Sequence, residues 1–255
     1  MDWLIETPIA HRGLHDANAG VPENSLAAFE AARDAGYPVE LDVRPLRDGE
    51  VAVFHDEDLE RLTGRATQLE NQDSTSIKSF RLAGTDQTVP LLTEVFDVIG
   101  GKVPLLIELK NFGIPGRLES AVRAALQSYN GRFAVQSFNP FSMGWFKAQA
   151  PNIIRGHLSG GFRNSSLEDD LLEMLRRLEL IDVSAPAFVG YDVRYLPFDP
   201  VTELRARGMP VLGWTVRSEN DRRHARECCD NFIFEYIDPR KQRLRLGESD
   251  DSKHA

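Results

Sequence analysis

Residues 39–56 read VELDVRPLRDGEVAVFHD, and this stretch decides the fold. Its first part, Val39 to Val43, is an apolar and β-branched run that nevertheless carries two carboxylates, Glu40 and Asp42. Because side chains alternate along a strand, both carboxylates point the same way. An unpaired charge inside an apolar strand is costly, so the pattern predicts a strand whose acidic groups are compensated by neighbouring groups.

The second part of the stretch returns the chain as a hairpin. Asp48-Gly49 is a favoured pair for a two-residue type I′ turn, and the segment is too short for a helical crossover. With this turn, Asp42 faces His55, with Cβ atoms about 4.5 to 5.5 Å apart. We therefore predict that His55 lies beside the two carboxylates.

Similar apolar runs alternate with helical patterns along the chain, such as Leu118 to Tyr129 and Leu167 to Leu178. Parallel strands joined by helices, eight within about 240 residues, predict an α/β fold of the TIM (β/α)8 barrel type. A doubly wound open sheet is the alternative, although no GxGxxG turn follows the first strand. The predicted strands are Pro8 to His11, Val39 to Val43, Val103 to Leu109, Phe133 to Ser137, Ile153 to Leu158, Leu180 to Ser184, Pro210 to Val216 and Phe232 to Ile237.

Two segments break this alternation. Residues 57–90 are polar and too long for a plain loop, so we predict a small insertion on the barrel rim after the hairpin. Residues 247–255 are polar and lack apolar periodicity, which predicts a disordered tail. The expected organisation is a single barrel over residues 1–246.

The composition is that of a soluble globular protein, with 255 residues, a net charge of -9 and 42% hydrophobic residues. The acidic balance argues against a dedicated surface for nucleic acid or anionic membrane. Residues 1–6 lack the features of a signal peptide, and no run of 18 apolar residues exists. The adjacent Cys228 and Cys229 suit a reducing compartment. We expect a cytoplasmic protein without stable membrane association, and its oligomeric state stays open.

In a TIM barrel, catalytic groups lie at the carboxyl ends of the strands. Carboxylates that converge there repel one another unless a cation lies between them, and a hard divalent ion fits oxygen ligands. A buried network of ion pairs is the alternative. Paired histidines and cations also supply what cleavage of a phosphodiester requires, namely charge compensation and proton transfer. The charged residues at the predicted strand ends are His11, Arg12, Glu40, Asp42, His55, Glu108 and Lys110.

Seven short motifs follow one another between residues 9 and 110: His11-Arg12-Gly13, Pro22-Glu23-Asn24-Ser25, Glu40-Leu41-Asp42-Val43, Asp48-Gly49 with Val53-Phe54-His55-Asp56, Leu59 to Gly64, Pro90 to Val95, and Ile107-Glu108-Leu109-Lys110. As an ordered set they resemble the glycerophosphodiester phosphodiesterase family. Ser137-Phe138 and Trp214-Thr215-Val216 resemble its later strands. The resemblance implies a TIM barrel of the PLC-like phosphodiesterase type. It also implies metal-dependent hydrolysis of glycerophosphodiesters, small soluble substrates, to glycerol 3-phosphate and an alcohol.

The resemblance also implies roles for individual residues. His11 and His55 match the acid/base pair, and the ligands of one divalent cation, Mg²⁺ or Ca²⁺, match Glu40, Asp42 and Glu108. Arg12 and Lys110 match the phosphate contacts, and Trp214 matches an aromatic residue beside the glycerol moiety. Gln136 and His157 end predicted strands and are further candidates for contact with the substrate.

The chain departs from the family's pattern in three places. Arg217 stands where Asn is common, and Phe234-Glu235-Tyr236-Ile237 replaces an Ile-Thr-Asp motif. The first loop, Leu14 to Val21, is long, and we expect its His15 to be solvated, with a head-group contact as the alternative. These departures surround the expected substrate pocket. They leave open a lysophospholipase D type reaction, a non-catalytic glycerophosphodiester-binding barrel, and a metal-dependent isomerase or lyase.

Overall fold

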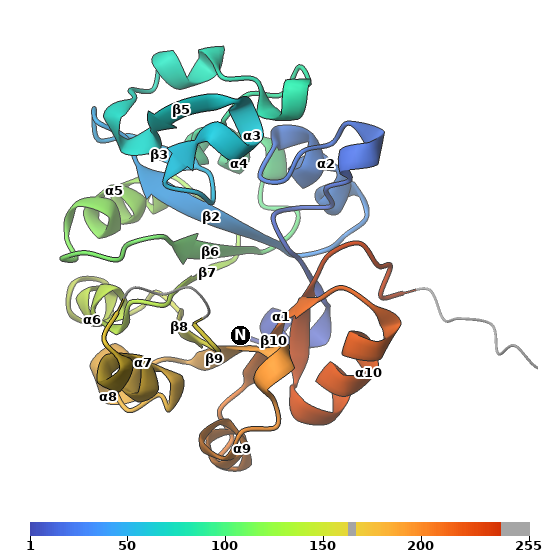
Figure 1. The fold of residues 1–255 in the computed structure, drawn as a ribbon, viewed down its shortest axis with the longest axis vertical. Coiled ribbons are helices and arrows are strands. Elements are labelled where there is room, and N and C mark those ends of the chain that lie inside the picture. Colours follow the sequence, from blue (N-terminus) through green and yellow to red (C-terminus); the bar gives the residue numbers. More distant parts are fainter. Residues whose placement is uncertain (163–166, 241–255) are drawn as a thin grey trace, which may run out of the picture.

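Parallel strands close into a barrel in the computed structural model, which describes residues 1–162 and 167–240 (Figure 1). Strand β1 pairs with β2 on one side and with β11 on the other, which closes the sheet. The predicted TIM barrel is thus confirmed, and the open doubly wound sheet is excluded. Within the described residues, the eight parallel strands are β1 (Ile9–Ala10), β2 (Val39–Pro45), β6 (Leu105–Leu109), β7 (Phe133–Ser137), β8 (Arg155–Ser159), β9 (Phe188–Asp192), β10 (Val211–Val216) and β11 (Asn231–Phe234).

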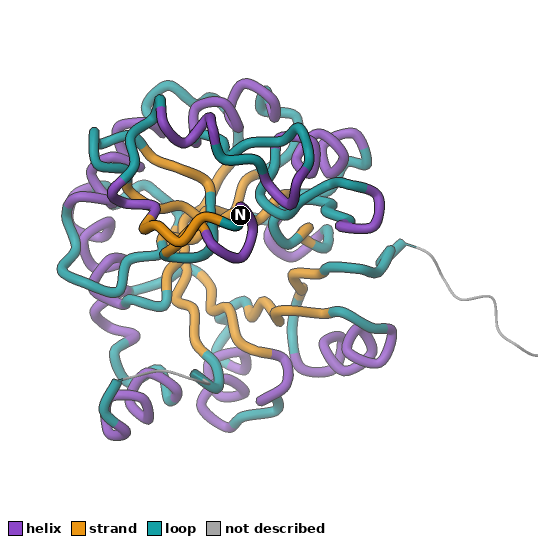
Figure 2. Tube along the Cα trace, turned by 45° about the horizontal axis from the view of Figure 1, so that its top comes forward, coloured by secondary structure: helices purple, strands orange, loops and turns teal. Residues whose placement is uncertain are grey.

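Helices surround the strands, as the purple and orange segments of Figure 2 show. In the described part of the chain, no helix combines the length and the apolar character needed to cross a membrane. The helices outside the insertion are α1 (Trp3–Glu6), α2 (Leu26–Asp34), α4 (Leu92–Ile99), α5 (Arg117–Leu126), α6 (Pro140–Gln149), α7 (Asp169–Arg176), α8 (Ile181–Ser184), α9 (Asp199–Ala206) and α10 (Glu219–Cys228), with the short 3-10 turns η1 (Ala17–Ala19) and η5 (Val193–Tyr195).

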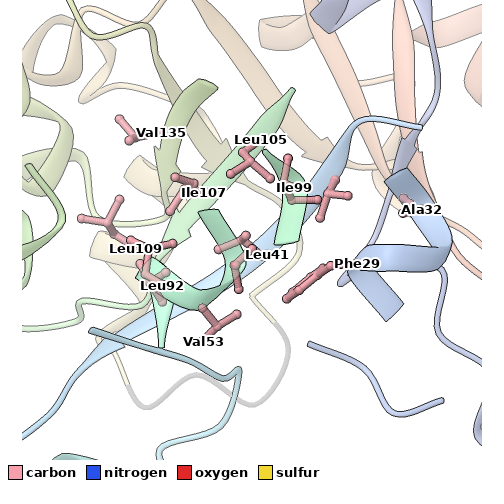
Figure 3. Close-up of a cluster of buried hydrophobic side chains, with 14 of the residues drawn as sticks. Phe29, Ala32, Leu41, Val53, Leu92, Ile99, Leu105, Ile107, Leu109 and Val135 are labelled. Carbon is pink, nitrogen blue, oxygen red and sulfur yellow. The ribbon is translucent and has the colours of Figure 1, made fainter. Parts of the chain in front are cut away.

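The alternation of side chains along β2 and β6 separates the apolar core from the barrel interior. Leu41 and Ile107 point outward and pack in the cluster that contains Phe29 of α2 and Leu92 of α4 (Figure 3). Because successive side chains of a strand point to opposite faces, the acidic residues between these apolar ones face inward. The parallel register pairs Asp42 with Glu108 directly. Packing of the outer face therefore fixes the position of the acidic groups inside.

The insertion after the hairpin strand β3 (Val51–Val53) packs on the hairpin itself and lies at the top of Figure 1. Leu59, Leu69 and Ile77 of the insertion share a buried cluster with Ala52 and Phe54 of the hairpin. This cluster holds the segment that carries His55. The elements of the insertion are β4 (Asp58–Leu59), α3 (Glu60–Thr63), β5 (Arg65–Gln68), η2 (Leu69–Asn71), η3 (Ser76–Ser79) and η4 (Leu82–Gly84).

The hairpin register differs by one residue from the prediction. Val43 faces Val53, and the backbone N–H of Phe54 donates to the carbonyl oxygen of Asp42 at 2.9 Å. The prediction that Asp42 faces His55 is therefore wrong.

The cause is the length of the loop. The N–H of Leu46 donates to the carbonyl oxygen of Glu50 at 2.8 Å, which leaves three residues, 47–49, in the turn. Gly49 has a φ of 92°, as a turn of three residues with a glycine bulge requires. The sequence Asp-Gly suits both turns, and the longer one was formed.

The predicted strand Leu180 to Ser184 is also wrong. Residues Ile181–Ser184 form the helix α8, and the strand in this part of the barrel is β9, Phe188–Asp192. Both segments are short apolar runs, and periodicity does not distinguish a strand from a buried helical turn at this length. The predicted tail, residues 247–255, lies outside the described residues.

Strand β1 forms a narrow seam in the barrel wall. It pairs with β11 at Ile9 and Ala10, but with β2 only at Ala10. The N–H of His11 continues the pairing by donating to the carbonyl oxygen of Phe234 at 2.9 Å. Residues 11 and 12 therefore enter the barrel mouth between the carboxyl ends of β2 and β11.

Helix α1 closes the opposite end of the barrel. Trp3 and Leu4 are 4% and 1% exposed, and they pack with interior residues such as Leu106 and Phe188. Asn231 donates hydrogen bonds to the carbonyl oxygens of Leu4 and Thr7, which fix the helix to β11. These contacts make α1 part of the core.

We expect Trp3→Ala to lower the free energy of unfolding by about 3 to 5 kcal/mol, because it removes a large buried side chain and leaves a cavity. Urea denaturation measures the effect. Ile5→Ala is the control on the same helix, because Ile5 is 45% exposed. Equal destabilisation by the two variants would contradict the packing described for α1.

Candidate active site

A strained turn projects His11 and Arg12 into the barrel mouth. Arg12 has a φ of 55° and Gly13 a φ of 81°, both in the left-handed region. A Cβ atom on Gly13 would lie 2.7 Å from backbone atoms of Ala28, so only glycine fits against α2. Non-glycine residues with such backbone angles cost roughly 1 to 3 kcal/mol and concentrate at functional sites. The His-Arg-Gly sequence therefore serves the site and not the stability of the turn.

Glu40, Asp42 and Glu108 form a buried acidic cluster at the carboxyl ends of β2 and β6. They are 1%, 0% and 6% exposed, and one ligand atom of each lies within 4.8 Å of the others. Asn24 Nδ2 donates to Asp42 Oδ2 at 2.9 Å, which orients the central carboxylate. The three acids predicted from strand periodicity thus converge on one point.

Two cations partly compensate this cluster. Lys110 Nζ lies 3.0 Å from Asp42 Oδ1 and 2.5 Å from Glu108 Oε1, and Arg12 Nε lies 3.1 Å from Asp42 Oδ2. Burial tends to raise the pKa of Asp42, but Lys110 and Arg12 outweigh it and hold that pKa well below its usual range. Asp42 is therefore ionised at neutral pH.

Glu40 is the carboxyl group of the cluster that has no cation of its own. Burial, followed by the charges of Asp42 and Glu108, raises the pKa of Glu40 well above its usual value. Its Oε1 has no hydrogen-bond partner among the described residues. Arg12 and Lys110 pair with Asp42 and Glu108, so one carboxyl group of the three is left without a cation, and the donors are all hard oxygens. The cluster therefore fits one divalent cation of the Mg²⁺ or Ca²⁺ type.

His11 lies between this cluster and a further carboxylate. Its Nδ1 is 2.7 Å from Glu235 Oε2, and its Nε2 is 3.9 Å from Glu40 Oε2. Burial lowers the pKa of His11 to about 4, against the opposing effect of Glu235. His11 is therefore neutral at neutral pH. Because the N–H at Nδ1 donates a hydrogen bond to Glu235, Nε2 keeps a free lone pair that is directed into the barrel mouth.

His55 has a similar arrangement on the other side. Its Nδ1 lies 2.7 Å from Asp56 Oδ1, and Arg61 Nε donates to Asp56 Oδ2 at 2.6 Å. Arg61 also makes two hydrogen bonds to Glu23, which in turn accepts from Arg12 Nη1 at 2.6 Å. This chain of contacts joins the hairpin to the His-Arg-Gly turn. It gives the Leu59 to Gly64 motif a structural role in holding His55.

These groups meet at a cavity of about 440 Å³. Trp214 and Phe138 form an aromatic wall, with ring centroids 5.4 Å apart and planes at 86°. Gln136 is 1% exposed, and its Oε1 has no hydrogen-bond partner within residues 1–162 and 167–240. Asp42 lies beneath the cavity, where it contacts Arg12 and Lys110. The predicted residues that line the cavity are His11, Arg12, Glu40, His55, Glu108, Lys110, Gln136 and Trp214.

The structure does not bring His157 to this cavity. Leu158 lines the cavity, and the preceding side chain, that of His157, points to the other face of β8. There it is 0% exposed, and its Nδ1 lies 2.9 Å from Ser184 Oγ of α8. The position of His157 near a strand end predicts its height along the barrel axis. It does not predict whether the side chain points into the barrel or outward. The prediction that His157 contacts the substrate is therefore wrong.

His157 leads to a prediction about stability and pH. Burial lowers its pKa from 6.5 to about 4 in the folded protein. As the pH falls below about 6.5, the unfolded chain binds a proton that the folded chain excludes, so the free energy of unfolding falls. We expect the stability of the wild type relative to His157→Gln to decrease by about 2 kcal/mol between pH 7 and pH 5.

Urea denaturation of both proteins at the two pH values measures this difference. His224→Gln is the matched control, because His224 is half-buried on α10. A parallel loss of stability in the wild type and in His157→Gln would contradict the assignment.

Glu235 was not predicted as a partner of His11, and the prediction that His15 is solvated is wrong. The His15 side chain is 5% exposed, not solvated, and its Nε2 lies 3.3 Å from Glu235 Oε2. Arg217 forms an ion pair with the same carboxylate. The contact between Glu235 and His11 could have been predicted from their positions in the chain. Glu235 directly follows the last strand, and that strand pairs with the strand that precedes His11.

Comparisons with known proteins return one family. A family model described as the glycerophosphoryl diester phosphodiesterase family matches residues 11–238. A glycerophosphodiester phosphodiesterase of Caldanaerobacter subterraneus subsp. tengcongensis is 32% identical over 232 residues, which cover 84% of this chain and 86% of that protein. One of Bacillus subtilis is 26% identical over 236 residues, 84% of this chain and 77% of that protein.

A solved structure shares the fold over most of the chain. It is a phosphodiesterase of Oleispira antarctica in complex with the product sn-glycerol-3-phosphate. Its TM-score is 0.74 at 26% identity, and the match covers 91% of this chain and 93% of that one.

Proposed function

This chain belongs to the glycerophosphoryl diester phosphodiesterase family, and from that premise we propose that its cavity hydrolyses glycerophosphodiesters to glycerol 3-phosphate and an alcohol. One observation carries the proposal. The same cavity joins a buried acidic cluster, two cations and two imidazoles, and each imidazole has a carboxylate on its Nδ1. This arrangement offers a cation site, contacts for a phosphate group and two proton-transfer groups within one space.

In this proposal Glu40, Asp42 and Glu108 hold one divalent cation, Mg²⁺ or Ca²⁺. The raised pKa of Glu40, which has no cation of its own, and its unpartnered Oε1 support the assignment. When bound, the cation would supply positive charge to the phosphate oxygens and to the attacking hydroxyl group. Arg12 and Lys110 would contact the same phosphate group. Their guanidinium and ammonium groups already lie at the cluster, where two carboxylates hold them in place.

The two histidines would transfer protons on opposite sides of the phosphate. His11 is neutral, with a pKa lowered by burial to about 4, and its free Nε2 suits acceptance of a proton from the attacking hydroxyl group. His55 would donate a proton to the leaving alkoxide. Asp56 supports this role, because it holds the Nδ1 of His55 and so directs Nε2 toward the cavity. In the first step the substrate's own vicinal hydroxyl group would displace the alcohol and form a cyclic phosphate. In the second step water would open that ring, and each histidine would take the opposite role.

The remaining lining residues suit the organic parts of the substrate. The indole of Trp214 offers an apolar face to a glycerol backbone, and the unpartnered Oε1 of Gln136 offers an acceptor for a hydroxyl group. A second cavity, of about 360 Å³, shares Lys110 and Phe112 with the first. It provides room for the alcohol next to the phosphate position.

A lysophospholipase D type reaction is the second candidate, and a separate observation favours it. Phe112, Ile114 and Phe141 are 66%, 94% and 55% exposed. Phe112 lines both cavities, and Ile114 lines the second. Asn139 Nδ2 donates to the carbonyl oxygen of Gly113 at 3.0 Å, which joins the loop of Phe112 and Ile114 to the start of α6, where Phe141 lies. Such an apolar rim would accommodate the acyl chain of a lysolipid.

A substrate panel tests both functions. Release of glycerol 3-phosphate is measured from glycerophosphocholine, glycerophosphoethanolamine and glycerophosphoglycerol, and release of choline from lysophosphatidylcholine, with Mg²⁺ or Ca²⁺ present. We expect the soluble diesters to be the better substrates. Preference for the lysolipid would support the second candidate, and absence of turnover with every member would refute both.

A further inference from the structure

The carboxylate of Glu235 is shared by three side chains at the barrel mouth. Its Oε2 lies 2.7 Å from His11 Nδ1 and 3.3 Å from His15 Nε2, and Arg217 Nε donates to Oε1. The side chains of Glu235 and His15 are 6% and 5% exposed. The contacts bring together one residue from each of the three places where the chain departs from the family's pattern. These are His15 of the long first loop, Arg217 after Trp-Thr-Val, and Glu235 after the last strand.

This sharing bears on the tautomer of His11. A neutral imidazole carries its proton on either nitrogen, and only the Nδ1–H form leaves Nε2 free to accept a proton. An ionised carboxylate held on Nδ1 selects that form. A carboxylate has about four lone-pair positions, so Glu235 accepts from two imidazoles and one guanidinium without losing any of these hydrogen bonds. Additional donors restrict its rotation.

His15 is itself fixed from a second side. Its ring meets the ring of Tyr236 edge to face, with centroids 5.2 Å apart and planes at 80°. Since Tyr236 follows Glu235 in the chain, this contact holds His15 over the carboxylate. The first loop is thereby attached to the end of β11.

The same three groups, His11, His15 and Glu235, offer donor atoms within 4.8 Å of one another, a spacing that also suits a metal ion. The guanidinium group of Arg217, however, already compensates this single carboxylate, because it pairs with the other oxygen. A second positive charge at Glu235 would be repelled by the guanidinium. The observations therefore favour a hydrogen-bonded cluster.

We propose that His15 is a positioning residue: by donating to Glu235 Oε2, together with Arg217 on Oε1, it holds that carboxylate against His11 and keeps Nε2 of His11 available for proton transfer. The effect on turnover rests on the proposed function, in which His11 accepts a proton. The effect on the His11 tautomer does not depend on any substrate.

The experiment compares the wild type with His15→Ala, and the first measurement is made without substrate. Ring ¹⁵N NMR of histidine-labelled protein reports the tautomer of His11. We expect the Nδ1–H form alone in the wild type and a mixture of forms in His15→Ala. Arg217→Gln, at a half-exposed side chain, is expected to shift the same signal in the same direction. An unchanged His11 signal in both variants would overturn the proposal.

Steady-state kinetics provide the second measurement. We expect kcat to fall roughly tenfold in His15→Ala, with KM within about twofold of the wild type, a loss similar to that of groups that orient metal-bound histidines. His15→Gln retains an N–H donor and is expected to recover most of the kcat. His224→Ala is the control for loss of a histidine outside the cavity. A change in KM alone, or no recovery by glutamine, would contradict the positioning role.

A chelator distinguishes the hydrogen-bonded cluster from a metal site. Dialysis of the wild type against a chelator is expected to leave the ring ¹⁵N signals of His15 unchanged, because His15 contacts Glu235 and not the acidic cluster. A changed His15 signal would overturn the proposal. Failure of the wild type to hydrolyse any member of the substrate panel would refute the proposed function alone. The NMR comparison would still decide the role of His15.

Discussion

His11→Ala is expected to lower kcat by about two to four decades, the usual contribution of a general acid or base. The geometry supports an effect of this size. His11 is neutral, its Nδ1 is held by Glu235 at 2.7 Å, and its Nε2 faces the acidic cluster. Neither Arg12 nor Lys110 replaces it, since both are cations without a lone pair for a proton.

The rate of glycerol 3-phosphate release from the best panel substrate measures this effect. His55→Ala is expected to lose a similar factor, because its partner Asp56 gives it an equivalent orientation. His224→Ala is the matched control, since His224 Nε2 contacts the carbonyl oxygen of Leu196 at 2.8 Å and does not line the cavity. Near wild-type turnover in His11→Ala would refute its assignment as a proton-transfer group.

Removal of divalent cations is expected to reduce turnover to the background rate, and Mg²⁺ or Ca²⁺ is expected to restore it. Without a cation, the acidic cluster lacks the positive charge that would compensate the phosphate group of the substrate. Glu108→Gln removes one ligand while it preserves the shape of the side chain. We expect this variant to require at least about tenfold more metal for half-maximal activity, as loss of a metal contact commonly does.

Glu203→Gln is the control for this variant, because Glu203 is exposed and pairs only weakly with Arg207 at 3.7 Å. Activity that resists the chelator in the wild type would refute the metal site. The pH provides a further check. Since the pKa of Glu40 is raised, binding of a cation displaces a proton, and the apparent metal affinity is expected to increase with pH.

The acidic cluster was predictable because it depends on short-range rules. Alternation along a strand places Glu40 and Asp42 on one face, and Glu108 follows the same rule on the neighbouring strand. The face is then decided by the apolar residues between them, which pack against the helices. No long-range information is needed for this part of the site.

Other parts of the site depend on details that a single sequence leaves open. The Asp-Gly pair at residues 48 and 49 is compatible with loops of two and of three residues, so the register of His55 differed by one. The apolar run at 180–184 has the composition of a strand and forms a helix. The contact between His11 and Glu235 joins residues separated by 224 positions. It exists only because the barrel closes.

Closure at β1 makes catalysis an indicator of the integrity of the barrel. This two-residue strand places His11 and Arg12 between the ends of its two neighbours. A molecule in which it has detached would keep its acidic residues but lack the proposed proton acceptor. During a denaturant titration, hydrolysis is therefore expected to disappear at or before the loss of far-ultraviolet ellipticity. Species that have opened at this one strand are expected to be inactive even while most of their secondary structure persists.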